Sequence, residues 1–215
     1  MDRRNLLLAA AASPLAALAA GSADADDSPA PTRTVLESAL GFGFGGGYAW
    51  KGTGVPRDVE HGGKVILRAD RDTTYCCGYT FAVFVEAARR LGRLKGVDAD
   101  ALRAAQRVWY GATGDGDETE RQCALAVEAA GGSAVKWKDA RPGDFAQIWR
   151  RTRKPSGHSV VFLAWAYERK ERIGITYLSS QKSTDGIGFR TEFFAGSGVQ
   201  GGTVDPKRVY LGTLG

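Results

Sequence analysis

The stretch from Thr73 to Leu91 constrains the fold more than any other part of this 215-residue chain. Apolar side chains recur along it at helical spacing, at Cys77, Phe81, Phe84, Ala88 and Leu91. Val83 and Val85 make its flanks apolar as well, so the N-terminal half of such a helix needs cover on all sides. Thr73 or Thr74 can cap its first turn, and Gly92 can end it. We therefore expect a helix embedded in a core.

The remaining elements fall into two groups along the chain. Helices are expected over Asp98–Tyr110 and Glu118–Ala130, the second opening with a capping box at Asp117 and Glu120. A short strand is expected at Lys64–Ala69, and further strands are expected at Phe145–Arg150, His158–Trp165, Ile173–Ser179 and Lys207–Leu211. Helices followed by consecutive strands are typical of an α+β domain with a mainly antiparallel sheet.

The N-terminus has the pattern of an export signal. A basic start at Arg3-Arg4 precedes an apolar run over 6–20, and Ala23-Asp24-Ala25 offers a cleavage site. The start also resembles a twin-arginine signal, and the alternative is an uncleaved amphipathic helix. We expect a signal peptide over 1–25, a polar linker over 26–40 and one domain over 41–215. The mature protein would be periplasmic or extracellular, and no other apolar stretch is long enough to span a membrane.

Composition narrows the partners and cofactors. The net charge of +5 favours anionic surroundings such as a cell wall, while no nucleic-acid motif is present. The basic cluster over 150–154 is expected to be a solvated loop. Three cysteines and two histidines show no metal-ligand spacing, and the glycine-rich stretch over 41–54 lacks a nucleotide-binding pattern. We expect no metal and no cofactor.

The cysteines are the first candidates for catalytic residues. Three cysteines in an exported chain leave a free thiol and are too few to staple the fold. Cys76 and Cys77 lie in the first turn of the embedded helix, where unpaired N–H groups lower a thiol pKa and can bind an oxyanion. The alternatives are core fillers or a vicinal disulfide. Cys123 is expected to be a small buried residue. If Cys76 stays free, the one intramolecular disulfide that the chain could still form is Cys77–Cys123.

A histidine supplies the matching base. His158 opens the most apolar of the expected strands, where Val or Ile would be usual, and a titratable ring there suits a base for a thiol. His61, in a Glu-His-Gly-Gly stretch, is expected to be an exposed loop residue.

Four segments then resemble, in order, the motifs of the NlpC-type cell-wall peptidases and their CHAP amidase relatives. Residues 74–81, TYCCGYTF, resemble the D-C-S-G helix start, and residues 140–145, ARPGDF, resemble the L-x-P-G-D-L turn. Residues 157–162, GHSVVF, are similar to the H-V-G-I strand, and residues 47–52, GYAWKG, are similar to the P-Y-V-W-G-G segment. The matches extend from Gly47 to about Ser180. The resemblance implies a papain-like fold.

The resemblance also implies roles for particular residues. Cys76 would be the nucleophile, with Cys77 a lesser candidate, and Gly78 would be the small residue where the helix meets the sheet. His158 would be the base, and Tyr48 would line the site.

The resemblance also implies a third catalytic group, which the family places on the strand after the histidine strand. Residues 177–182, YLSSQK, look like the CHAP S-E-Q-N stretch. Gln181 is preferred, because its carbonyl can accept a hydrogen bond from the imidazole, and Ser180, at the position of the CHAP glutamate, is the lesser candidate. The other interpretation of Gln181 is an ordinary residue at a strand end. Two features depart from the family: the stretch between Cys76 and His158 is longer than usual, and Tyr75 stands where aspartate is common.

The sequence therefore favours an exported cysteine hydrolase that cleaves amide bonds, with peptidoglycan stem peptides as the substrate that the resemblance implies. One alternative is a papain-like amidase or acyltransferase acting on another exported substrate. Another is an inactive module of the same fold that binds a peptide or the wall. The oligomeric state stays open.

Overall fold

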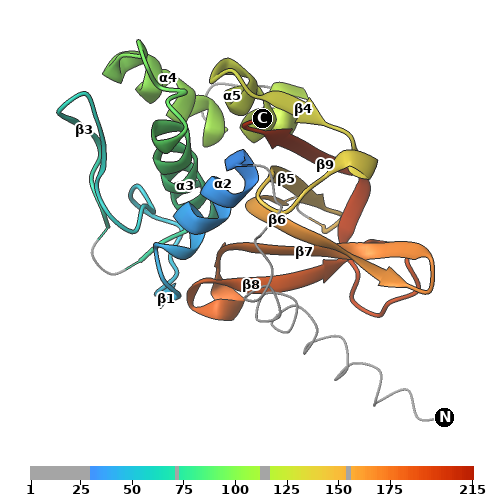
Figure 1. Ribbon diagram of the computed structural model, residues 1–215. Helices are drawn as coiled ribbons and strands as arrows, with labels where there is room; N and C mark the ends of the chain where they lie inside the picture. The colour runs from blue at the N-terminus through green and yellow to red at the C-terminus, as the bar shows by residue number, and fades with distance from the viewer. Residues whose placement is uncertain (1–29, 71–72, 112–116, 154–155) are drawn as a thin grey trace, which may run out of the picture.

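The computed structural model describes residues 30–70, 73–111, 117–153 and 156–215. The expected export signal lies outside these residues, as do the side chains of the expected capping box at Asp117 and Glu120. The described chain is a mixed α+β structure, in which four helices lie on one side of a curved sheet (Figure 1). These helices are α2 (Ala30–Leu40), α3 (Cys76–Arg90), α4 (Ala99–Trp109) and α5 (Asp117–Ala129).

The main sheet of the described residues has seven strands in the order β1-β8-β7-β6-β5-β9-β4, and each pair of neighbours is antiparallel. In chain order the strands are β1 (Gly45–Gly46), β4 (Ser133–Val135), β5 (Phe145–Arg150), β6 (Ser156–Glu168), β7 (Glu171–Gln181), β8 (Gly186–Phe193) and β9 (Val204–Thr213). A separate hairpin pairs β2 (Val59–His61) with β3 (Lys64–Leu67). This arrangement confirms the expected α+β class and antiparallel sheet.

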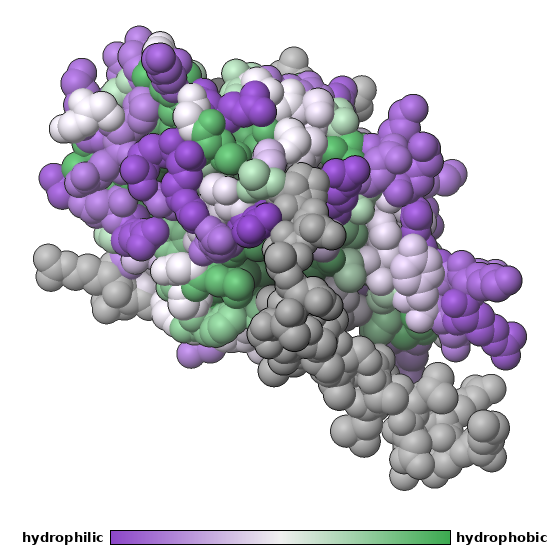
Figure 2. All heavy atoms as spheres, in the orientation of Figure 1, coloured by the Kyte–Doolittle hydropathy of each residue, from purple (hydrophilic) through white to green (hydrophobic). Residues whose placement is uncertain are grey.

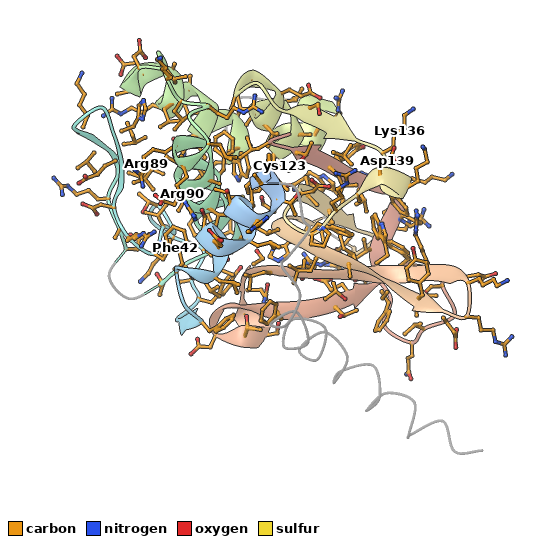
Figure 3. All side chains as sticks on the ribbon, viewed as in Figure 1. Phe42, Arg89, Arg90, Cys123, Lys136 and Asp139 are labelled. Carbon is orange, nitrogen blue, oxygen red and sulfur yellow. The ribbon has the colours of Figure 1, made fainter. Side chains whose placement is uncertain are left out.

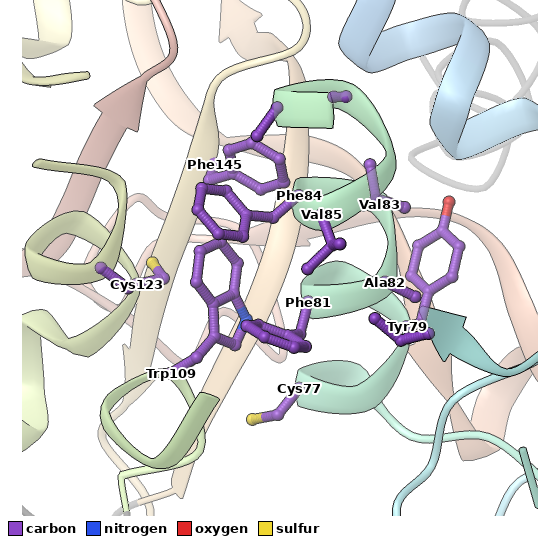
Figure 4. Packing of buried hydrophobic residues seen from close by; sticks show 14 of the residues in the cluster. Cys77, Tyr79, Phe81, Ala82, Val83, Phe84, Val85, Trp109, Cys123 and Phe145 are labelled. Carbon is purple, nitrogen blue, oxygen red and sulfur yellow. The ribbon is translucent and has the colours of Figure 1, made fainter. Parts of the chain in front are cut away.

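The larger core lies between the helices and the sheet. Phe84 of α3 packs against Trp109 of α4, and both rings contact Phe145 of β5 (Figure 4). Burying each large apolar side chain stabilises the fold by about 1.5–3 kcal/mol. Thr80 adds a polar link, because its Oγ1 accepts from Trp109 Nε1 at 2.9 Å and bonds Ser159 Oγ of β6 at 2.8 Å. The first half of α3 is buried all round, as expected.

A second core covers the other face of the sheet. Phe162 and Tyr177 are buried there, under an aromatic stack of Trp137 and Trp165 with ring centroids 4.8 Å apart. Because the middle of β6 is covered on both faces, it needs a nearly continuous apolar sequence rather than an alternating one. Hydrophilic residues cover much of the helical side of the molecule in Figure 2.

Several boundaries differ from the sequence expectation. Residues 30–40, expected to be part of a linker, form α2, whose Val35 and Ala39 are buried against α3. Pro31 suits its first turn, where no N–H partner is lost. The strand β8 was not anticipated. Within the described ranges, no helix has the length and apolar character to cross a membrane.

The expected threonine cap of α3 is wrong. The N-cap residue is Tyr75, and it makes no side-chain capping bond. Thr74 instead bonds the carbonyl of Gly47 and the hydroxyl of Ser180. The start of α3 is therefore fixed by distant segments rather than by a local cap.

We predict that Gly78→Ala destabilises the protein. A Cβ at this position would lie 2.2 Å from the carbonyl carbon of Gly54 and 2.5 Å from the carbonyl oxygen of Thr53, and neither backbone atom can move easily. We expect a loss of about 1–3 kcal/mol in thermal or urea unfolding. Helix propensity alone predicts the opposite sign, a gain of about 0.5–1 kcal/mol, so a stabilised variant would contradict this packing.

Candidate active site

Cys76 is the first residue of α3, and the residue before it sets its position. Tyr75 is extended, with φ −146° and ψ 170°. Its ring stacks on Trp50 at 5.8 Å with an interplanar angle of 8°, and its hydroxyl donates to the carbonyl of Gly52. Gly54, at φ +64°, lies against the same ring, where any side chain would collide with it. Packing of the glycine-rich segment against Tyr75 thus fixes the position of Cys76 at the start of α3.

That segment, residues 47–54, runs alongside the chain that leads into α3. Thr74 N donates to the carbonyl of Gly47 at 3.0 Å, and Ala49 N donates to the carbonyl of Thr74 at 3.3 Å. Tyr48 and Thr74 form an isolated parallel bridge. Ser180, the lesser candidate, lies on the helical face of the sheet, where its hydroxyl is 2.7 Å from Thr74 Oγ1. Its hydroxyl therefore supports the start of α3 and does not contact His158.

His158 lies near the start of β6, and Gln181 lies at the end of β7, so both stand at the same end of the sheet. His158 is 5% exposed, and its Nε2 lies 3.4 Å from Gln181 Oε1. The ring also makes an edge contact with Tyr177. The structure thus brings together His158 and the preferred third residue.

Neighbours of Gln181 decide the orientation of its amide and, through it, the histidine tautomer. Gln181 Nε2 donates to the carbonyl of Gly188 at 3.2 Å and to Thr184 Oγ1 at 2.6 Å. A carbonyl can only accept, so Oε1 faces the imidazole and accepts its Nε2–H. The neutral ring then carries its lone pair on Nδ1, the nitrogen that remains to take a proton from a thiol.

Cys76 has the electrostatic surroundings of a thiolate. The hydrogen bond from the Cys77 thiol, with the two sulfurs 3.8 Å apart, is the largest cause that holds the pKa of Cys76 well below its ordinary value. Burial acts in the opposite direction. The charge of His158 and a hydrogen bond to its ring lower the pKa further, as does the backbone N–H of Ser159.

Cys77 and Cys123 have the opposite character. The hydrogen bond that Cys77 gives to Cys76 is the main cause that raises the pKa of Cys77 well above the ordinary range, and burial adds to it. Burial also raises the pKa of Cys123. Both sulfurs lie in the core on either side of Trp109 in Figure 4, and all three cysteines are free thiols, so the disulfide Cys77–Cys123 is not formed.

Tyr48 lies beside the chain that leads into α3, where it forms an isolated bridge with Thr74, two residues before Cys76. Burial raises the pKa of its phenol, Cys76 raises it further, and Arg150 lowers it. Tyr48 is half-buried, and Cys76 itself is only 2% exposed.

A surface recess lies elsewhere, along the side of α3 that carries Glu86 and Arg89. It is lined by Phe42 and Arg57 as well, and Arg57 stacks over the ring of Phe42 at 4.2 Å. Figure 3 labels Phe42 and Arg89 of this lining. Cys76 is not part of this lining. His61 lies nearby on β2, half-buried, with Nε2 2.7 Å from the carbonyl of Val97, so the expected exposed loop is wrong.

Sequence reasoning missed an ion pair beside His158. Arg150 was assigned to a solvated cluster, but its side chain is only 18% exposed and it bonds Glu192 of β8 through Nε at 2.7 Å and Nη2 at 2.5 Å. Tyr177 also donates to Glu192. Burial raises the pKa of Glu192, but the hydrogen bonds and charge of Arg150 outweigh burial and bring it to about 2. In the sequence, the only sign of this ion pair is the acidic residue Glu192, which lies in a strand that the sequence analysis does not predict.

In the part of the chain that the structure describes, no group of three or more His, Cys, Asp or Glu residues could hold a metal ion. Comparison with protein-family models, with curated proteins and with solved structures found no match.

We predict that alkylation selects Cys76 among the three cysteines. At neutral pH one equivalent of iodoacetamide should be incorporated into the native protein and map to Cys76, because only this thiol has a lowered pKa. After unfolding, all three thiols should react, since none is in a disulfide. Prior labelling of Cys77 or Cys123 in the native protein would contradict the assignment.

Proposed function

We propose that the protein is an exported cysteine hydrolase of papain-like fold that cleaves amide bonds. The observation that carries the proposal is the combination of a low-pKa Cys76 at the start of α3 with His158, whose tautomer is set by Gln181. Structural cysteines are ordinarily inert and have raised pKa values, as Cys123 has here.

The geometry supports a sequence of steps. Cys76 Sγ, as thiolate, attacks the carbonyl carbon, and the electron pair of the C=O bond moves to the oxygen. The N–H groups of the first turn of α3 can hold that oxyanion, since Tyr75 makes no side-chain cap there. The imidazolium of His158 gives its Nδ1 proton to the leaving amine as the C–N bond breaks. Water, deprotonated by the same nitrogen, then releases the acid and frees the sulfur.

Peptidoglycan stem peptides are the substrate we propose. The four ordered motif matches and the export signal expected in the sequence support this choice, and the net charge of +5 is compatible with an anionic wall. An acyltransferase would share the acyl-enzyme and differ only in the acceptor that replaces water.

Incubation with purified peptidoglycan fragments, followed by mass spectrometry, tests the proposal. We expect products that have gained one water across a stem-peptide amide, and a loss of at least about a thousandfold in rate for Cys76→Ala. Gln181→Leu should lower the rate about tenfold or more, because the imidazole loses the acceptor that orients it.

The matched control is Cys123→Ala, which removes another buried thiol and should keep the activity of the wild-type protein if it folds. Absence of cleavage by the wild-type protein, while Cys76 still reacts as a low-pKa thiol, would remove the wall substrate. Equal activity of the wild-type protein and Cys76→Ala would remove the cysteine mechanism.

A further inference from the structure

Arg150 stands on the same face of the sheet as His158. In the register of β5 and β6, Ile148 is opposite His158 and Arg150 is opposite Ser156, so Arg150 lies two residues nearer the end of the sheet. Its guanidinium turns inward rather than into solvent, because Glu192 accepts from both Nε and Nη2. The bidentate pair, held in turn by Tyr177, fixes the plane of the guanidinium.

One edge of that guanidinium remains available. The two bonds to Glu192 use Nε and Nη2 and leave Nη1 outside this bidentate pair. Tyr177, which donates to Glu192, also contacts the His158 ring, with ring centroids 5.4 Å apart. Arg150 therefore lies on the His158 side of the site, and a molecule that is bound between Cys76 and His158 would have Arg150 beside it.

The charges around Arg150 favour an anion. Arg190 Nε lies 3.7 Å from Glu192 Oε1, so two guanidiniums surround this one carboxylate. Cys76 and His158 together carry no net charge, whether their shared proton lies on the sulfur or on the imidazole. Arg151, the next residue along, is paired with Asp205 and adds no net charge. A net positive charge is left around Glu192, on the His158 side of the site.

We propose that Arg150 binds a carboxylate of the substrate, carried on the residue next to the amide bond that Cys76 attacks. The inference rests on the proposed function and specifies its substrate class: peptides with a free carboxylate beside the scissile bond. A fixed, planar guanidinium suits this role, since charge-assisted hydrogen bonds to a carboxylate are among the strongest in proteins. Glu192 positions Arg150 and does not touch the substrate.

Two alkylating agents that differ only in a carboxylate test the proposal directly. Iodoacetate carries a carboxylate where iodoacetamide carries a neutral amide, and both react with the same thiolate. We expect the ratio of the iodoacetate rate to the iodoacetamide rate at Cys76 to be about tenfold or more higher in the wild-type protein than in Arg150→Gln/Glu192→Gln. The double variant is chosen because Arg150→Gln alone would leave the buried Glu192 without its bidentate partner.

Arg151→Gln/Asp205→Asn is the matched control. It neutralises a neighbouring pair of the same kind and should keep the wild-type ratio. A ratio that is unchanged in Arg150→Gln/Glu192→Gln would overturn the role of Arg150 and leave the thiolate intact. Failure of Cys76 to react with either reagent would overturn the proposed function together with the inference.

A measurement on the wild-type protein covers the case in which the double variant does not fold. Glutarate should slow the reaction of Cys76 with iodoacetamide, because the dicarboxylate occupies the space beside Arg150, and glutaramide should not. Equal effects of glutarate and glutaramide would show that no carboxylate site adjoins the sulfur.

Discussion

The burial of a thiol at an uncapped helix start, against an imidazole from a distant strand, is the interaction on which the site depends. A buried thiolate is costly unless several donors compensate for the water it has lost. Here the Cys77 thiol, His158 and the N–H of Ser159 supply that compensation and outweigh burial. Burial also acts on Cys123, where it outweighs the backbone N–H groups of Cys123 and Ala124 and raises the pKa. The donors around each sulfur therefore decide whether the pKa of a buried thiol is lowered or raised.

The glycine-rich segment over 47–54 makes this arrangement possible. It lies so close to the start of α3 that Gly78 has no room for a side chain, and it holds Tyr75 in an extended conformation under Trp50. It also pairs with Thr74, the residue that leads into Tyr75 and Cys76. A glycine-rich stretch thus supports the first turn of the helix.

Features that depend on residues close together in the chain could be predicted from the sequence. The apolar run in α3 required burial, whereas the pairing of His158 with Gln181 was implied by the resemblance of residues 177–182 to the CHAP S-E-Q-N stretch. The choice between Gln181 and Ser180 depended on which face each side chain takes, because adjacent residues of a strand point to opposite faces. Sequence could favour Gln181, but only the register of β7 with β6 places Ser180 on the helical side with Thr74.

The errors all came from contacts between distant segments. Residues 30–40 look like a polar linker because the helix α2 is stabilised by packing on α3 rather than by its own sequence. Arg150 sits in a run of basic residues, and nothing local shows that it turns toward Glu192 on β8. Tyr75 replaced the expected threonine cap because Thr74 is engaged by Gly47 and Ser180.

The state of Cys76 is tested most directly by following the ultraviolet absorbance of the thiolate against pH, as the difference between the wild-type protein and Cys76→Ser. The account predicts that this difference titrates well below the range of an ordinary thiol, and that His158→Ala moves the transition upward. A transition in the ordinary thiol range, unaltered by His158→Ala, would contradict the account.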